Sequence, residues 1–164
     1  MRHLPNPEAY FVSEALAAGG FPIGELGGDG SDRVARFEAL GVTTFVDLTH
    51  PADPLPRYDG LLRSARRISH PIVDMAAPGI GQMERILDDV DDAIAAGGLT
   101  YLHCWGGIGR TGTVVGCWLV RHGLDGGDAI ARIAELRRLA LDSSMPSPQT
   151  TAQRELVRGW RRHR

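Results

Sequence analysis

A cysteine and an arginine stand six positions apart in a glycine-rich turn: Cys104 and Arg110, in residues 103–112, HCWGGIGRTG. Glycines let the backbone N–H groups of such a turn converge without obstruction by Cβ atoms, and a nest of this kind at the start of a helix binds oxyanions. The helix dipole and Arg110 both favour a thiolate at Cys104, while the guanidinium can hold two oxygens of a phosphate. A nucleophile, an anion cradle and a cationic clamp in one turn predict covalent phosphoryl transfer.

Phosphoryl transfer from an alcohol or a phenol also needs a proton donor, because an alkoxide or phenoxide is a poor leaving group. Asp74 is the candidate: it lies thirty residues before Cys104, at the end of a predicted strand, on a loop bounded by proline and glycine. Its alternative role is that of a turn residue or of an N-cap for the next helix. Asp47 is the rival carboxylate, but it lies within an apolar strand and we interpret it as structural.

The elements that must position these residues follow from the hydrophobic pattern. Runs rich in β-branched and apolar residues predict strands over 42–48, 68–73 and 99–103. Apolar residues at helical spacing predict helices over 32–40, 82–96, 113–120, 126–140 and 148–162. This alternation predicts an α/β fold with a central parallel four- to five-stranded sheet flanked by helices, and the reactive turn at the carboxyl end of a central strand. We expect a single domain over residues 1–164.

The pattern also predicts how some segments begin. Asp32 is expected to cap the first helix, and Ser147 to cap the last one, with a proline at its first position. Residues 1–20 are expected to be irregular, with a helical turn around Glu14–Ala18.

Composition excludes several other kinds of chemistry. The 164 residues contain no lysine, which rules out a Walker A loop and a Schiff-base lysine. A net charge of -2 argues against a nucleic-acid partner. Two cysteines without a CxxC spacing argue against a disulfide scaffold and a structural zinc site, and we expect no metal and no cofactor. No apolar run suits a membrane span and prolines interrupt any signal-peptide core, so we expect a cytoplasmic protein. The arginine, alanine and glycine bias indicates a bacterial source.

The segment HCWGGIGRTG resembles the signature of the cysteine-dependent protein tyrosine phosphatase superfamily: His-Cys, five residues, Arg, then Ser or Thr. Within it the chain is most similar to the compact, dual-specificity branch that includes the kinase-associated phosphatases. The similarity runs from about His70 to Trp160. It implies the cysteine-phosphatase fold and a metal-independent hydrolase of phosphate monoesters.

The resemblance also implies a role for each residue of the turn. Cys104 would attack phosphorus and form a cysteinyl-phosphate, and Arg110 would bind the phosphate and stabilise the transition state. Thr111 would hydrogen-bond the departing thiolate, and His103 would fix the backbone of the turn from behind. The equatorial phosphate oxygens would be bound by the backbone amides of Trp105, Gly106, Gly107, Ile108, Gly109 and Arg110.

Two further segments resemble parts of that superfamily. Residues 70–78, HPIVDMAAP, are similar to its general-acid loop and place Asp74 as the acid. Residues 149–153, QTTAQ, are similar to a motif near the pocket in which a glutamine orients the hydrolytic water. Gln149 and Gln153 both fit that role, and the spacing does not choose between them. The alternative is a polar face at the start of a helix.

Two other functions fit parts of the pattern. Residues 107–112 satisfy the GxGxxG of dinucleotide-binding folds, but no acid-terminated strand follows within about 20 residues, as that fold requires. A catalytically silent phosphate- or phosphopeptide-binding module is the second alternative. Inactive relatives usually lack the cysteine, the arginine or the acid, whereas all three are present here.

The substrate is predicted from the side chains of the turn. Arg110 is its only cation, and Trp105 and Ile108 are its other large side chains; phosphoinositide-directed relatives often carry a lysine there. This favours one phosphate on an aromatic or peptide group, hence a protein tyrosine phosphatase or dual-specificity phosphatase acting on phosphorylated proteins, with phosphotyrosine preferred. A phosphatase of a small phosphorylated metabolite or of a lipid is the alternative. The oligomeric state is left open.

Overall fold

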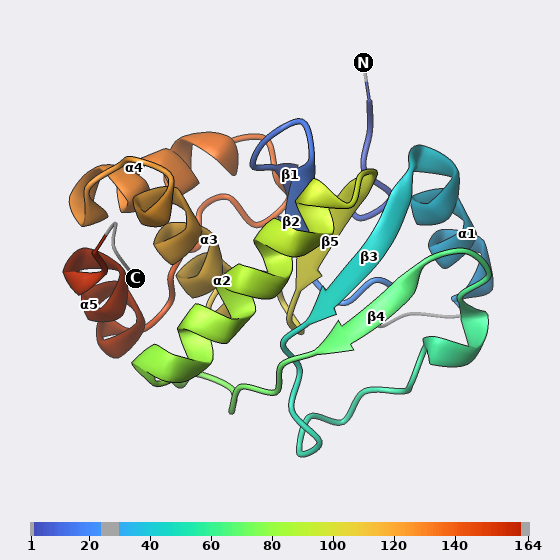
Figure 1. Cartoon of the computed structure of the whole chain (residues 1–164), viewed down its shortest axis with the longest axis horizontal. Coiled ribbons are helices and arrows are strands. Elements are labelled where there is room, and N and C mark those ends of the chain that lie inside the picture. The colour runs from blue at the N-terminus through green and yellow to red at the C-terminus, as the bar shows by residue number, and fades with distance from the viewer. Residues whose placement is uncertain (1, 24–29, 162–164) are drawn as a thin grey trace.

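A mostly parallel five-stranded sheet forms the centre of the computed structural model, which describes residues 2–23 and 30–161 (Figure 1). The strand order is β1-β2-β5-β3-β4. The strands are β1 (Tyr10–Phe11), β2 (Leu16–Gly19), β3 (Val42–Asp47), β4 (Arg66–Ser69) and β5 (Leu99–His103). Strands β2, β5, β3 and β4 run parallel, and the edge strand β1 pairs antiparallel with β2. The predicted α/β fold with a central sheet is confirmed, and the antiparallel edge is an addition to it.

β5 occupies the middle of this sheet and carries the reactive turn at its end. All five of its residues are buried, as expected of a strand that is covered on both faces. Its side chains alternate, so that Tyr101 joins the apolar cluster on one face and Leu102 joins the cluster on the other. The strand ends at His103, opposite Asp47 at the end of β3. Cys104 therefore follows directly at the carboxyl edge of the sheet, as predicted.

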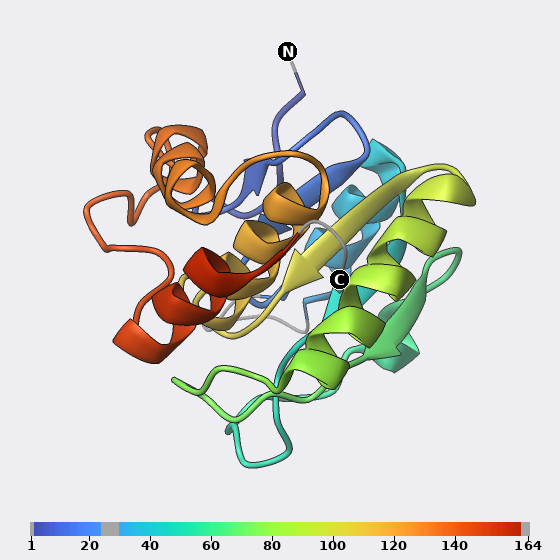
Figure 2. The same cartoon turned by 60° about the vertical axis from the view of Figure 1, so that its left-hand side comes forward.

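The helices cover both faces of the sheet. α1 (Ser31–Leu40) packs on one face, while the remaining helices lie on the other (Figure 2). These are α2 (Ile80–Ala95), α3 (Arg110–Arg121), α4 (Gly126–Leu136) and α5 (Thr151–Gly159), and a short 3-10 helix covers Asp59–Leu61. In the described ranges no helix is long and apolar enough to cross a membrane.

α3 is the central helix of its layer and contacts α2, α4 and α5. Its close approach to α5 depends on Gly116, because a Cβ atom at that position would lie 2.7 Å from Cγ2 of Val157. The apolar stretch of the sequence is thus buried, as its composition predicts.

The prediction for the N-terminal segment is wrong. Residues Leu16–Gly19 form strand β2 in place of a helical turn around Glu14–Ala18, and β1 precedes it as a hairpin partner. All four residues of β2 are buried. The strand pairs in parallel with β5 over its whole length, so tertiary pairing outweighs the helical preference of its leucine and alanines.

Several element ends also differ from the prediction. α1 begins at Ser31 with Gly30 as its N-cap and no side-chain cap, so Asp32 lies in the first turn, where its charge suits the helix dipole. The last helix is capped by Thr150 and not by Ser147. The second predicted strand is observed as β4 and ends at Ser69, before Pro71, which has no N–H to donate to a strand partner.

Candidate active site

In the turn between β5 and α3, a backbone N–H group contacts the sulfur of Cys104, the predicted nucleophile. The N–H of Gly107 donates a hydrogen bond to Sγ of Cys104 at 3.3 Å. Gly107 has φ 79, and a Cβ atom there would lie 2.5 Å from the carbonyl carbon of Gly19. Only glycine fits this left-handed position against β2. The turn therefore offers a backbone donor to the sulfur, which stabilises negative charge on it.

A cavity of about 240 Å³ opens over Cys104. It brings together residues from three separate parts of the chain that the sequence predicted as one site. From the turn come Cys104, Trp105, Gly106, Ile108, Gly109 and Arg110, from the loop after β4 come Asp74 and Met75, and from the segment before α5 comes Gln149.

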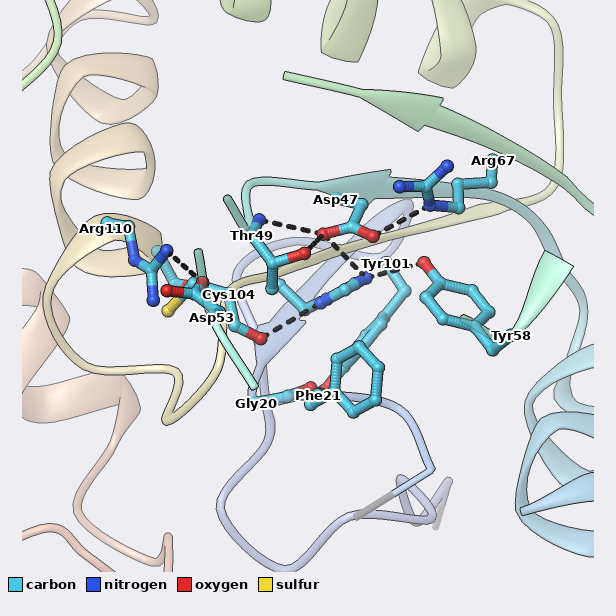
Figure 3. Close-up of polar contacts among 12 residues, drawn as sticks. Gly20, Phe21, Asp47, Thr49, Asp53, Tyr58, Arg67, Tyr101, Cys104 and Arg110 are labelled. Atoms are coloured by element: carbon cyan, nitrogen blue, oxygen red, sulfur yellow. Dashed lines mark hydrogen bonds and ion pairs between the residues drawn. The ribbon is translucent and has the colours of Figure 1, made fainter. Parts of the chain in front are cut away.

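Arg110 is the first residue of α3, and its guanidinium lies buried beside the cavity with a side-chain exposure of 1%. One nitrogen, Nη1, donates to Oδ2 of Asp53 at 2.7 Å (Figure 3). It also donates to the carbonyl oxygen of Ile72 at 2.9 Å. The other, Nη2, lies 3.2 Å from Oδ1 of Asp74. Nε is buried and has no hydrogen-bond partner within the described structure. The Nε–Nη2 edge of the fork is thus the edge left for an oxyanion.

Asp74 is half-exposed, at 51% of its side chain, and it extends from the loop that joins β4 to α2. The next residue, Met75, has φ 68, and its N–H donates to Oδ1 of Asp74 at 3.0 Å. A left-handed methionine is a strained backbone position of the kind found where a loop must aim a side chain. The carboxylate lines the cavity over Cys104 and lies 3.2 Å from Nη2 of Arg110.

His103 lies directly behind the turn and is fully buried. Burial lowers its pKa, so the ring is neutral near pH 7. Its Nδ1 donates to the carbonyl oxygen of Cys104 at 3.1 Å, and its Nε2 accepts from the hydroxyl of Tyr58 at 2.6 Å. Burial also raises the pKa of Tyr58 and keeps this hydroxyl protonated. The two hydrogen bonds fix both the tautomer and the orientation of the ring.

Asp47 lies on the far side of this histidine, and it does not line the cavity over Cys104. Its side chain is 3% exposed and accepts hydrogen bonds from Thr49 and from Nε of Arg67. Burial opposes ionisation, but the hydrogen bonds from Thr49 and Arg67 outweigh it and lower the pKa of Asp47. Asp47 therefore supports the turn from behind, as the structural interpretation of this residue predicted (Figure 3).

The comparisons with known proteins point to one family. Residues 23–162 match the PTP-SAK family, described as the Swiss Army Knife protein, DSP-PTPase phosphatase domain. The chain belongs to this family. The match confirms the expected resemblance to compact dual-specificity cysteine phosphatases.

Individual relatives agree with this assignment. The putative tyrosine phosphatase 067L of Invertebrate iridescent virus 3 is 31% identical over 121 residues, which are 70% of this chain and 46% of the viral protein. The chain thus spans less than half the length of that relative. The DSP-PTPase fold is shared with the kinase-associated phosphatase carrying serine for its catalytic cysteine (TM-score 0.76, 19% identity, covering 87% and 83% of the two chains). It is also shared with TpbA of P. aeruginosa in complex with phosphotyrosine (TM-score 0.71, 19% identity, covering 97% and 88%).

The two glutamines of this DSP-PTPase domain occupy different positions. Gln149 lines the cavity with Cys104. Gln153 is fully buried; its Oε1 accepts from the N–H groups of Gln149 and Thr150, and its Nε2 donates to the carbonyl oxygen of Ala76 at 3.2 Å. Gln153 thus connects the start of α5 to the loop that carries Asp74 by hydrogen bonds, whereas Gln149 lines the cavity over Cys104.

Thr111 is buried in the first turn of α3, and its hydroxyl donates to the carbonyl oxygen of Gly19 at 3.2 Å. This bond joins the turn to the end of β2. The sequence analysis did not single out Asp53, which binds Arg110, and it did not predict the contact of Tyr58 with His103. The available signal for both was their position after β3, at the carboxyl edge of the sheet where the loops of α/β folds gather around a site.

Proposed function

We propose that this DSP-PTPase domain hydrolyses phosphate monoesters through a cysteinyl-phosphate intermediate, with phosphotyrosine in proteins as the preferred group. One observation carries the proposal: the buried Nε of Arg110 has no partner in the described structure, and Arg110 lines the same cavity as Cys104. Buried donors without partners are rare in folded proteins. A phosphate oxygen would satisfy this donor, and a second oxygen would bind Nη2 in the bidentate geometry that arginine offers to phosphate.

In the first step the thiolate of Cys104 attacks phosphorus. The S–P bond forms while the P–O bond to the leaving group breaks, and the leaving oxygen takes the proton of Asp74. The phosphate must displace the Asp74 carboxylate from Nη2 of Arg110, since both need the same edge of the fork. The displaced carboxylate takes up a proton from solvent, and Asp74 can then reach the leaving oxygen and donate this proton to it.

In the second step water attacks the cysteinyl-phosphate. Gln149 orients the water from the rim of the cavity, and the Asp74 carboxylate takes one of its protons. The P–O bond to water forms, the S–P bond breaks, and inorganic phosphate leaves with the Cys104 thiolate restored. Backbone N–H groups of residues 105–110 carry the charge of the equatorial oxygens in both steps.

The lining of the cavity supports a substrate with one phosphate. Among its described lining residues Arg110 is the only cation, while Trp105 and Met75 offer apolar surface to an aromatic ring. A headgroup with several phosphates would need further cations. The phosphotyrosine bound to the structural relative TpbA supports the same choice.

The dinucleotide-binding alternative finds no support in the topology. That fold needs a second βα half after the glycine-rich turn, whereas the described chain after α3 contains only the helices α4 and α5.

Hydrolysis of p-nitrophenyl phosphate in EDTA tests the proposal, with Cys104→Ser as the variant and Cys117→Ser as the matched control. Cys117 is buried in α3, away from the cavity, and burial raises the pKa of its thiol. We expect turnover by wild type and by Cys117→Ser, and less than about a thousandth of it for Cys104→Ser. Turnover that survives in Cys104→Ser would contradict the covalent route. Phosphate binding without turnover by wild type would indicate a silent binding module.

A further inference from the structure

We propose that Asp53 is a positioning residue of the reaction: it holds Arg110 by Nη1 so that the Nε–Nη2 edge faces the substrate phosphate. This inference rests on the proposed function, because it assigns the residue that orients the phosphate clamp of the same site.

The contact between the two side chains is buried and short. Oδ2 of Asp53 lies 2.7 Å from Nη1 of Arg110, and the two side chains are 6% and 1% exposed. The same oxygen accepts the N–H of His50 at 3.0 Å, which holds the carboxylate in a tight turn after β3. The carbonyl oxygen of Ile72, on the loop after β4, is the second acceptor for Nη1. Acceptors on two loops thus bind the same nitrogen of the guanidinium, Nη1.

The two hydrogen bonds of Nη1 determine the orientation of the whole Arg110 guanidinium. A guanidinium is planar and rigid, so fixing one edge fixes the direction of the other. Nε and Nη2 share the remaining edge. Nε is buried without a partner in the described structure, and Nη2 lies 3.2 Å from the half-exposed Asp74. An edge that is oriented before the substrate arrives needs no reorganisation during the reaction.

Charge gives Asp53 a role that Asp74 does not share. A buried arginine is strongly destabilised without a counterion. Asp74 must leave Arg110 when phosphate binds and then donate its proton, so it is a temporary partner. Asp53 has neither task and remains as the permanent counterion, held by its turn. The two carboxylates that contact the guanidinium therefore have different roles: Asp53 orients Arg110, and Asp74 is displaced from Arg110 by the substrate phosphate.

Asp53→Asn isolates the charge of this residue. The amide oxygen can still accept from His50 and Arg110, so the turn keeps its hydrogen bonds while the counterion is lost. Asp59→Asn is the matched control: Asp59 is a carboxylate six residues further on, 42% exposed, and it pairs with Arg57 and Arg67 on the surface side.

The experiment measures kcat/KM for p-nitrophenyl phosphate and for phosphotyrosine, and the affinity for tungstate as an oxyanion probe. For Asp53→Asn we expect both kcat/KM values to fall by a similar factor, roughly 10- to 100-fold, and tungstate to bind at least about tenfold more weakly. Asp59→Asn should match wild type. In an Arg110→Lys background, Asp53→Asn should lower kcat/KM and the tungstate affinity little further, because lysine has no planar guanidinium to orient.

The results separate this inference from the proposed function. Wild-type turnover with an unchanged kcat/KM and tungstate affinity in Asp53→Asn would overturn the positioning role and leave the phosphatase intact. A loss confined to the poorer leaving group would also overturn it, because that pattern belongs to the proton donor. If wild type shows no turnover, the tungstate affinities still decide: equal affinity for wild type and Asp53→Asn refutes the inference, and a weaker affinity of the variant supports it.

Discussion

Asp74→Asn should change catalysis and oxyanion binding in opposite directions. The substitution removes the proton donor, and general acids contribute about 10²- to 10⁴-fold to a rate. It also removes the negative charge that lies 3.2 Å from Nη2 of Arg110. We therefore expect kcat for phosphotyrosine to fall by about 100-fold or more, while the affinity for tungstate or inorganic phosphate rises.

The size of the gain in affinity follows from the exposure of the pair. Coulomb's law gives about 1.3 kcal/mol for unit charges at this separation in bulk water. Asp74 is half-exposed, and solvent-exposed ion pairs are worth roughly 0.2–1 kcal/mol when measured. Since each 1.4 kcal/mol is about a factor of ten, tungstate should bind up to about fivefold more tightly to the variant.

Steady-state kinetics over a pH series and calorimetric titration with tungstate measure both effects. Wild type should show a bell-shaped profile, because activity requires the thiolate of Cys104 and the protonated form of Asp74. The variant should lose the decline at high pH. An unchanged kcat and an unchanged alkaline decline would refute the acid assignment, and a weaker tungstate affinity would refute the exchange between Asp74 and phosphate.

Three further predictions concern the surroundings of the site. Burial lowers the pKa of His103, so the unfolded chain binds the proton more readily; stability should be full above about pH 6.5 and decline as the pH falls below it, as measured by urea unfolding at pH 8 and pH 5. Gly116→Val should lower the free energy of unfolding by about 1–3 kcal/mol or more, because its side chain would overlap Val157, and urea unfolding at pH 8 checks this. Mild peroxide should inactivate the enzyme until a thiol reductant is added, with mass spectrometry finding the oxidation at Cys104, which lines the cavity, and none at Cys117, which does not; persistent activity would contradict a reactive thiolate.

The turn over residues 103–112 could be predicted because its signal is local. Within ten residues the sequence 103–112 supplies the end of a strand, glycines for a tight turn, the nucleophile, the cation and the start of a helix. Asp74 and the pair Gln149 and Gln153 could be predicted because they lie in short motifs that resemble those of the superfamily, although the spacing did not choose between the two glutamines. The structure brings Cys104, Arg110, Asp74 and Gln149 to one cavity.

The parts that the sequence did not predict depend on contacts between distant segments. Asp53 and Arg110 are 57 residues apart, and Tyr58 and His103 are 45 residues apart. Nothing in the proline-rich segment around Asp53 marks that carboxylate as the partner of a helix terminus. β2 was missed for the same reason, because Leu16–Gly19 becomes a strand only through its pairing with β5.

The loop that carries Asp74 is anchored on both sides of this residue. At its start, His70 lies 2.6 Å from Asp89 of α2; at its end, the carbonyl oxygen of Ala76 accepts a hydrogen bond from Gln153. The carboxylate between these anchors is half-exposed and lines the same cavity as Cys104. Anchored ends with an exposed carboxylate between them suit a proton donor that must exchange with its substrate at every turnover, whereas the buried, doubly bonded Asp53 suits a partner that never leaves.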